Sequence, residues 1–135
     1  MAQKLEGPAR QLLEDPNFAY VATVRDDGTP LVVPTWVDVD NGHVVLNSNE
    51  DRTWPRRLRE GGVATITVPN KDNPYEYVSF TGELVEDTHE GADEHIDRLA
   101  HKYLGADEYP NRFPGEQRVI LRLRPDRVRY YNPNG

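Results

Sequence analysis

The sequence contains no cysteine, and this absence excludes several kinds of site at once. A chain without thiols has no thiolate nucleophile, no cysteine-bound zinc and no iron–sulfur cluster. No stretch approaches the roughly 18 apolar residues of a membrane-spanning helix, and the N-terminal segment lacks the apolar core of a signal peptide. With 135 residues, the chain is predicted to form a single domain over 1–135 that is soluble, cytoplasmic and free of membrane contact.

The short motifs of several common enzyme classes are also missing. Neither G-x-G-x-x-G nor a Walker A sequence is present, and Ser48 and Ser79 lack the G-x-S-x-G context of a serine hydrolase. His95 and His101 are six residues apart on an expected helix, so their side chains diverge by roughly 120° and do not easily share a metal. We therefore expect no metal site, solvated histidines, and solvated acids rather than a catalytic carboxylate pair within 83–97.

The net charge of −7 argues against nucleic acid as a partner, but its distribution is uneven. Residues 83–108 carry nine acids against Arg98 and Lys102, which accounts for the whole net charge. The neutral remainder contains two arginine-rich runs, at 52–59 and 118–129. Because arginine suits bidentate contacts with phosphates and carboxylates, either run could bind an anion, although ordinary solvated charge is an equally good interpretation.

Hydrophobic periodicity and turn residues divide the chain into short elements. A short helix is expected before Asp15, and a helix over 51–60 would have Asp51 as its N-cap and Pro55 in its first turn. A third helix is expected over 90–104, where one apolar stripe ends at a glycine. The alternating segments predict strands at 18–24, 30–39, 43–48, 63–68, 75–88, 117–125 and 128–131.

These elements predict a mainly β fold, a β-barrel with short helices. Asp26-Asp27-Gly28-Thr29 and Asp40-Asn41-Gly42 have hairpin-turn chemistry, so the first three strands are expected to form an antiparallel meander. Residues 69–74 are expected to form a polar loop. Closing such long antiparallel strands into a small barrel would remove their exposed edges.

The segment 46–62 has the composition of an anion site. An expected strand runs into Asn47-Ser48-Asn49 and is followed by a short helix with several arginines. A helix N-terminus offers free N–H groups and a positive dipole end, which together can hold a phosphate without a glycine-rich loop. A solvated basic helix is the alternative interpretation. Aromatic side chains could supply flat walls for a ring system, although each could equally belong to the core or an interface: Trp36, Trp54, Tyr75 and Tyr77.

Several stretches in one order give the chain a family resemblance. They are DGTPLVVPTWVDVDNGHVVLNS, DRTWPRRLR, NPYEYVSFTGELVED, EGADEHIDRLAHKYLGADEYP and PGEQRVILRLRPDRV. With these the chain resembles the split β-barrel flavin and deazaflavin oxidoreductases of the pyridoxamine-5′-phosphate-oxidase-like superfamily. More narrowly, it resembles the class-B group that depends on coenzyme F420. The resemblance covers nearly the whole chain, and 90–110 followed by Pro114-Gly115-Glu116 is its most distinctive part.

The resemblance implies an FMN-binding-like split β-barrel and a homodimer with two cofactor sites at the subunit interface. It implies an F420-dependent oxidoreductase that transfers hydride to a reducible small organic substrate. The segment from the third strand into the helix would hold the cofactor phosphate through Asn47, Ser48, Arg52 and Arg56. Trp54 and Arg57 of the same segment are also expected to bind the cofactor. The ring would stack near Pro34, Thr35 and Trp36, with Tyr75 and Tyr77 on the opposite wall or against the partner subunit.

Two departures from the family pattern bear on these expectations. Many relatives carry a lysine in the phosphate segment where this chain has Trp54, so arginine would have to supply the charge. The chain ends at Tyr130-Tyr131-Asn132-Pro133-Asn134-Gly135, without the carboxy-terminal substrate segment of true pyridoxamine-phosphate oxidases, so pyridoxal phosphate synthesis is not expected. An FMN enzyme of the same fold and a non-catalytic F420 or flavin carrier stay open as alternatives.

Overall fold

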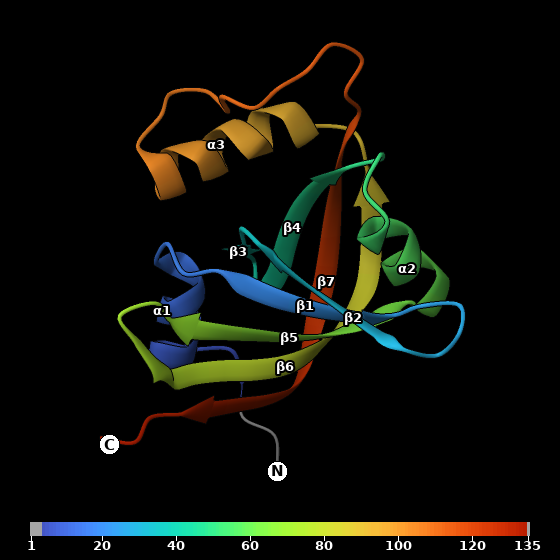
Figure 1. The fold of residues 1–135 in the computed structure, drawn as a ribbon. Helices are drawn as coiled ribbons and strands as arrows, with labels where there is room; N and C mark the ends of the chain where they lie inside the picture. The colour runs from blue at the N-terminus through green and yellow to red at the C-terminus, as the bar shows by residue number, and fades with distance from the viewer. Residues whose placement is uncertain (1–3, 135) are drawn as a thin grey trace.

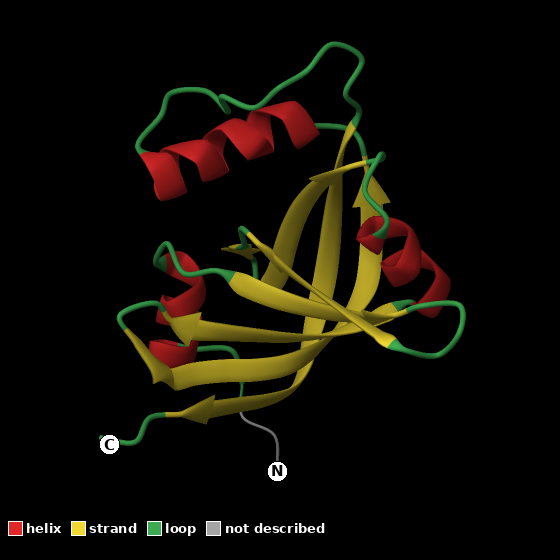
Figure 2. Ribbon diagram, viewed as in Figure 1, coloured by secondary structure: helices red, strands yellow, loops and turns green. Residues whose placement is uncertain are grey.

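A computed structural model describes residues 4–134, in which three helices accompany one sheet of seven strands. The helices are α1 (Gly7–Glu14), α2 (Trp54–Gly61) and α3 (Ala92–Leu104). The strands are β1 (Ala19–Val24), β2 (Pro30–Thr35), β3 (Asp38–Asp40), β4 (His43–Asn49), β5 (Val63–Asn70), β6 (Asn73–Thr88) and β7 (Arg118–Tyr131). Figure 1 shows α3 lying across one end of the sheet, far from the C-terminus, and Figure 2 shows how strands dominate the molecule.

The sheet is antiparallel throughout, in the order β2-β1-β5-β6-β7-β4-β3. Its two edge strands, β2 and β3, are consecutive in the chain and are joined only by Trp36 and Val37. Since so short a link connects opposite edges, the sheet must curl round until they meet, which is the predicted barrel. The fold is therefore a mainly β split barrel, as expected from the sequence.

The predicted meander of the first three strands is correct in its two hairpins but wrong in its middle strand, which is divided between opposite edges of the sheet. Strand β4 pairs with β3 and β7, and β2 pairs only with β1 among the described strands. The expected single strand over 30–39 breaks at Trp36 and Val37, because the chain there passes from one edge of the sheet to the other. Turn chemistry identified the two hairpins correctly, but it carries no information on which strands pair across the sheet.

Three further boundaries differ from expectation. Helix α2 begins after Thr53 rather than Asp51, although Pro55 does lie in its first turn. The expected loop over 69–74 is mostly strand, with β5 and β6 meeting at a tight turn. The last two expected strands form the single strand β7, in which Arg127 adopts a positive φ of 52°.

The barrel interior is filled by alternating side chains of the long strands. Val21, Ile66, Phe80 and Leu121 are fully or almost fully buried, and each such side chain stabilises the fold by about 1.5–3 kcal/mol. Buried residues of α1 and α2 belong to the same core, so these two helices close gaps that the sheet leaves. At Gly82 a Cβ atom would lie only 3.0 Å from Leu123 Cδ1, so β6 and β7 approach closely there.

The acidic stretch 83–108 is less solvated than expected, because several of its carboxylates pair with arginines from the rest of the chain. Arg59 contacts Asp87 at 2.5 Å, and Arg124 contacts Glu83 at 2.8 Å. Pairs this exposed contribute at most about 1 kcal/mol each. These pairs also bear on function, since each guanidinium nitrogen that already faces an acid is less available to a ligand. No helix among residues 4–134 is both long and apolar enough to cross a membrane.

Candidate functional site

A cavity of about 240 Å³ lies where the two ends of the curled sheet meet under α3. Strand β3 pairs with β4 only at His43, Val44 and Val45, so the end of β4 at 46–49 has no strand on that side. We call the gap between this free edge and the end of β2 the seam. The cavity is lined by Phe18, Pro34, Thr35, Trp36, Asn47, Ser48, Arg52, Trp54, Ile96, Tyr109, Asn111 and Arg118.

One wall of the cavity is aromatic. Trp36 stacks on Tyr103 with ring centroids 5.0 Å apart and planes 5° from parallel, and Tyr109 meets Trp36 edge-on at 5.8 Å. Phe18 stacks on the same Tyr103 ring at 5.9 Å. Aromatic pairs in these geometries hold one another rigidly, so the wall is a preformed flat surface for a ring system.

The Tyr103 hydroxyl anchors this aromatic wall to the backbone. It accepts a hydrogen bond from the Val37 amide at 3.0 Å and donates to the Asn17 carbonyl at 2.6 Å. Burial raises the pKa of Tyr103 to about 12. Lys102 adds a second anchor, donating to the Val37 carbonyl at 2.7 Å, and burial lowers the pKa of its ammonium group. Both groups hold α3 against the link between the sheet edges rather than facing a ligand.

A chain of buried polar side chains forms the opposite wall. Arg118 Nε donates to Asn47 Oδ1 at 2.8 Å, and Asn47 Nδ2 donates to the Ala92 carbonyl at 2.9 Å. Asn47 Nδ2 also lies 3.1 Å from His95 Nδ1, and His95 Nε2 lies 3.1 Å from Asp38 Oδ2. The expectation of solvated histidines is wrong for His95, whose side chain is only 2% exposed.

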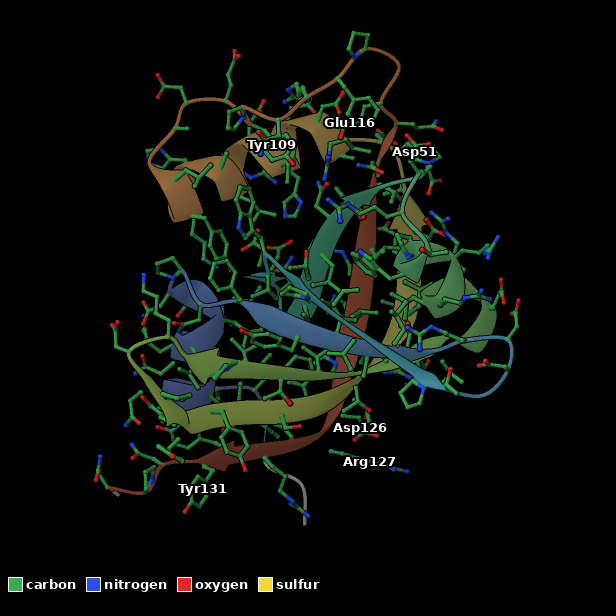
Figure 3. All side chains as sticks on the ribbon, in the orientation of Figure 1. Asp51, Tyr109, Glu116, Asp126, Arg127 and Tyr131 are labelled. Carbon is green, nitrogen blue, oxygen red and sulfur yellow. The ribbon has the colours of Figure 1, made fainter. Side chains whose placement is uncertain are left out.

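The carboxylates on this wall are paired. Burial raises the pKa of Asp38, but hydrogen bonds from His95 and from the Val39 amide outweigh it, so the net pKa lies below the usual value. Arg118 Nη1 donates to Glu116 Oε1 at 2.5 Å, and both side chains are almost completely buried. Figure 3 shows Glu116 and Tyr109 beside α3, at the end of the barrel opposite Asp126, Arg127 and Tyr131.

Two polar groups at the cavity have no partner in the described part of the chain. The Ser48 hydroxyl is buried, in a residue only 2% exposed, and makes no hydrogen bond. Arg52 is exposed at the cavity and faces no acidic side chain among residues 4–134. A buried hydroxyl without a partner is unusual in a native structure, and Ser48 Oγ is therefore a candidate for contact with a ligand oxygen.

Comparison with known proteins identifies the family. The family model described as pyridoxamine 5'-phosphate oxidase matches residues 5–132, almost the whole chain. The chain belongs to the pyridoxamine 5'-phosphate oxidase family. No curated protein matches the sequence.

Solved structures of other proteins have a similar fold. A protein named F420 reductase superposes with a TM-score of 0.79 at 26% identity, over 92% of this chain and 98% of that one. HupZ of Group A Streptococcus has a TM-score of 0.66 at 20% identity, over 93% and 98% of the two chains. A conserved hypothetical protein of Mycobacterium tuberculosis gives 0.66 at 19%, over 98% and 88%. The fold is thus that of flavin- and deazaflavin-dependent oxidoreductases.

Within this pyridoxamine 5'-phosphate oxidase fold, the structure brings seven of the eleven residues predicted for cofactor binding to one cavity. These are Pro34, Thr35, Trp36, Asn47, Ser48, Arg52 and Trp54. They come from β2 and the link that follows it, from β4, and from the loop before α2 and the first residue of α2. These segments meet only because the sheet curls. Their contact with a cofactor stays a prediction.

The other four predicted residues lie away from the cavity. Arg57 forms an ion pair with Asp26, and Arg56 lies 3.5 Å from Glu60. Tyr75 is 72% exposed, and Tyr77 packs against another tyrosine near the C-terminus. None of these four residues therefore lines the cavity of this subunit.

The sequence prediction missed five residues that line the cavity: Phe18, Ile96, Tyr109, Asn111 and Arg118. Arg118 begins a strand that otherwise alternates cleanly, and nothing in its neighbourhood distinguishes it from Arg122 or Arg124. Tyr109 and Asn111 belong to an irregular stretch without periodicity. No cluster of three or more potential metal ligands exists within residues 4–134.

Proposed function

We propose that the protein is an F420-dependent oxidoreductase that binds reduced F420 in the cavity at the seam and passes its hydride to a reducible small organic substrate. The observation that carries this proposal is the pairing of an aromatic wall with two polar groups, Ser48 Oγ and Arg52, that lack partners within residues 4–134. A ligand with a flat ring and an oxyanion satisfies both halves of this arrangement. The likeness to a structure named F420 reductase supports the choice of cofactor.

The residues present fit such a cofactor. Ser48 Oγ and the Arg52 guanidinium would contact the phosphate oxygens, and the start of α2 would add the positive end of a helix dipole. Pro34, Thr35 and Trp36 would lie along the ring. When bound, F420 supplies the hydride chemistry, so this chain needs no nucleophile of its own. Its side chains bind the cofactor, orient it and exclude water.

We also propose that the molecule is a homodimer. The strand register places Tyr20, Val24, Val32 and Val63 on one outer face of the sheet, and all four side chains are exposed. Tyr77 lies on this same face. Exposed apolar side chains gathered on one face are typical of an interaction surface. Val32→Glu should therefore produce monomers, as measured by light scattering; a wild-type protein that is strictly monomeric would contradict the dimer.

Separate fluorescence titrations with F420 and with FMN test the proposed function. We expect saturable F420 binding and consumption of reduced F420 with some members of a panel of enones, quinones and nitro compounds. Purified protein that is yellow and carries FMN would replace the F420 assignment by an FMN enzyme of the same fold. Tight F420 binding without turnover across the whole panel would instead indicate a carrier, and binding of neither cofactor would refute both.

A further inference from the structure

Arg118 has one guanidinium nitrogen, Nη2, without a hydrogen-bond partner in the described chain. The residue is only 6% exposed, and its guanidinium has Nε on Asn47, Nη1 on Glu116 and Cζ 5.0 Å from the Tyr109 ring centroid. For Nη2, residues 4–134 offer no acceptor. Because Arg118 lines the cavity, Nη2 is available to a ligand oxygen there.

The hydrogen bonds that hold Arg118 allow only one arrangement. An arginine Nε can only donate, and a carbonyl oxygen can only accept, so Asn47 must turn Oδ1 to Arg118 and Nδ2 to Ala92. Asn47 Nδ2 then faces His95 Nδ1, which must act as the acceptor. The imidazole proton is therefore on Nε2, where it is donated to the Asp38 carboxylate.

This chain of bonds links four elements of the fold. It runs from Asp38 in β3 through His95 in α3 and Asn47 in β4 to Arg118 in β7. Each member is buried or half-buried, so water competes little for these bonds. The guanidinium is thus fixed before any ligand arrives, which lowers the entropy cost of binding.

Two further observations favour an oxyanion at Arg118. The unpartnered Ser48 hydroxyl lines the same cavity. Trp54 lies in the core, and Arg56 and Arg57 face Glu60 and Asp26. Within residues 50–57 of the described chain, Arg52 is therefore the only cation without an acidic partner. A cofactor phosphate would otherwise be held by a single exposed arginine.

We propose that Arg118 is the second phosphate-binding cation of this site, and that His95 is a positioning residue that holds it through Asn47. The proposal rests on the proposed function, since it concerns the phosphate of the cofactor. Arg118 would donate from Nη2 to a phosphate oxygen, while its pairing with Glu116 keeps the empty site close to neutral.

The test compares the affinity for each cofactor with the affinity for the alcohol that lacks its phosphate group. For F420 this is the deazaflavin alcohol without the phosphate and the groups attached through it, and for FMN it is riboflavin. Removing Arg118 alone would strand a buried carboxylate, so the variant is the double substitution Arg118→Gln/Glu116→Gln. We expect it to bind F420 about 10- to 100-fold more weakly and the deazaflavin alcohol unchanged. Arg118→Lys should lie between, and Arg124→Gln, exposed on the same strand, should behave as wild type.

Variants at His95 test the positioning role. His95→Leu should lower the preference for F420 over the deazaflavin alcohol, while His95→Asn should restore most of it, because an amide oxygen can accept from Asn47 as Nδ1 does. Mere loosening of the fold would weaken both ligands equally and leave this preference unchanged. An unchanged preference in both variants would overturn the positioning role.

The outcomes separate this inference from the proposed function. Wild-type binding of F420 that the double variant does not weaken, or equal weakening of both deazaflavins, would overturn the role of Arg118. The wild type could instead prefer FMN to riboflavin and show no preference between the two deazaflavins. If the double variant then loses the preference for FMN, the F420 assignment fails, but the role of Arg118 in phosphate binding is supported. If no cofactor binds, broadening of the ³¹P signal of inorganic phosphate that depends on Arg118 would support the site, and its absence would overturn it.

Discussion

Replacing Arg52 by glutamine should weaken F420 binding without weakening the fold. The Arg52 side chain has no acidic partner among residues 4–134, so its loss strands no charge and breaks no ion pair. A hydrogen bond to a charged group is worth about 1.5–3 kcal/mol, and exposure reduces this through screening. We therefore expect a loss of about 1–2 kcal/mol in binding free energy, or roughly a 5- to 30-fold rise in Kd.

Arg56→Gln provides the matched comparison, because Arg56 lies four residues further along and is exposed beside Glu60. Fluorescence titrations of both variants at low and at high ionic strength measure the effect, with thermal unfolding as the check on stability. The loss in Arg52→Gln should shrink as salt is added. Equal Kd values for Arg52→Gln and wild type, or an equal loss in Arg56→Gln, would refute the assignment of phosphate contact to Arg52.

Three further predictions concern single groups. Ser48→Ala should weaken F420 binding by about 0.5–1.5 kcal/mol in titrations while leaving the urea midpoint unchanged or higher, because the hydroxyl has no partner to lose within residues 4–134. The pKa of Tyr103 is about 12 in the folded protein and near 10 in the unfolded chain. The unfolding free energy should therefore be unaffected by this group below pH 10 and fall by about 2 kcal/mol as the pH rises to 12. Urea titrations of Tyr103→Phe should lack this fall. Gly82→Ala would bring a Cβ 3.0 Å from Leu123, so the unfolding free energy should fall by about 1–3 kcal/mol. An unfolding free energy equal to that of wild type would show that β6 and β7 can move apart there without cost.

Local patterns in the sequence were enough for most elements of the fold. The alternation of Val119, Leu121 and Leu123 predicted an inward face that the structure confirms, and the stripe of α3 did the same for that helix. The pairing of strands was not predictable in this way. The partner of β4 lies some 70 residues further along the chain, and hairpin chemistry describes only neighbouring strands.

The candidate site was predictable in part for the same reason. Residues contiguous with the strand-to-helix segment, such as Ser48 and Arg52, could be named from the sequence, whereas Arg118 reaches the cavity only through the curvature of the sheet. His95 did leave a signal. It lies three residues after Ala92 and four before Leu99, both buried in the stripe of α3, so its position on the helix already indicated burial.

The two-residue link between β2 and β3 couples ligand binding to the stability of the barrel. Trp36 lines the cavity, and the neighbouring Val37 amide is hydrogen-bonded to Tyr103, so the segment that would touch a ring also ties the sheet edges together. A ligand bound only by the native state should raise the melting temperature, and the rise should continue with the logarithm of ligand concentration beyond saturation. Hydrogen exchange at the Val37 amide should slow as ligand is added, which would report binding even when no substrate is known.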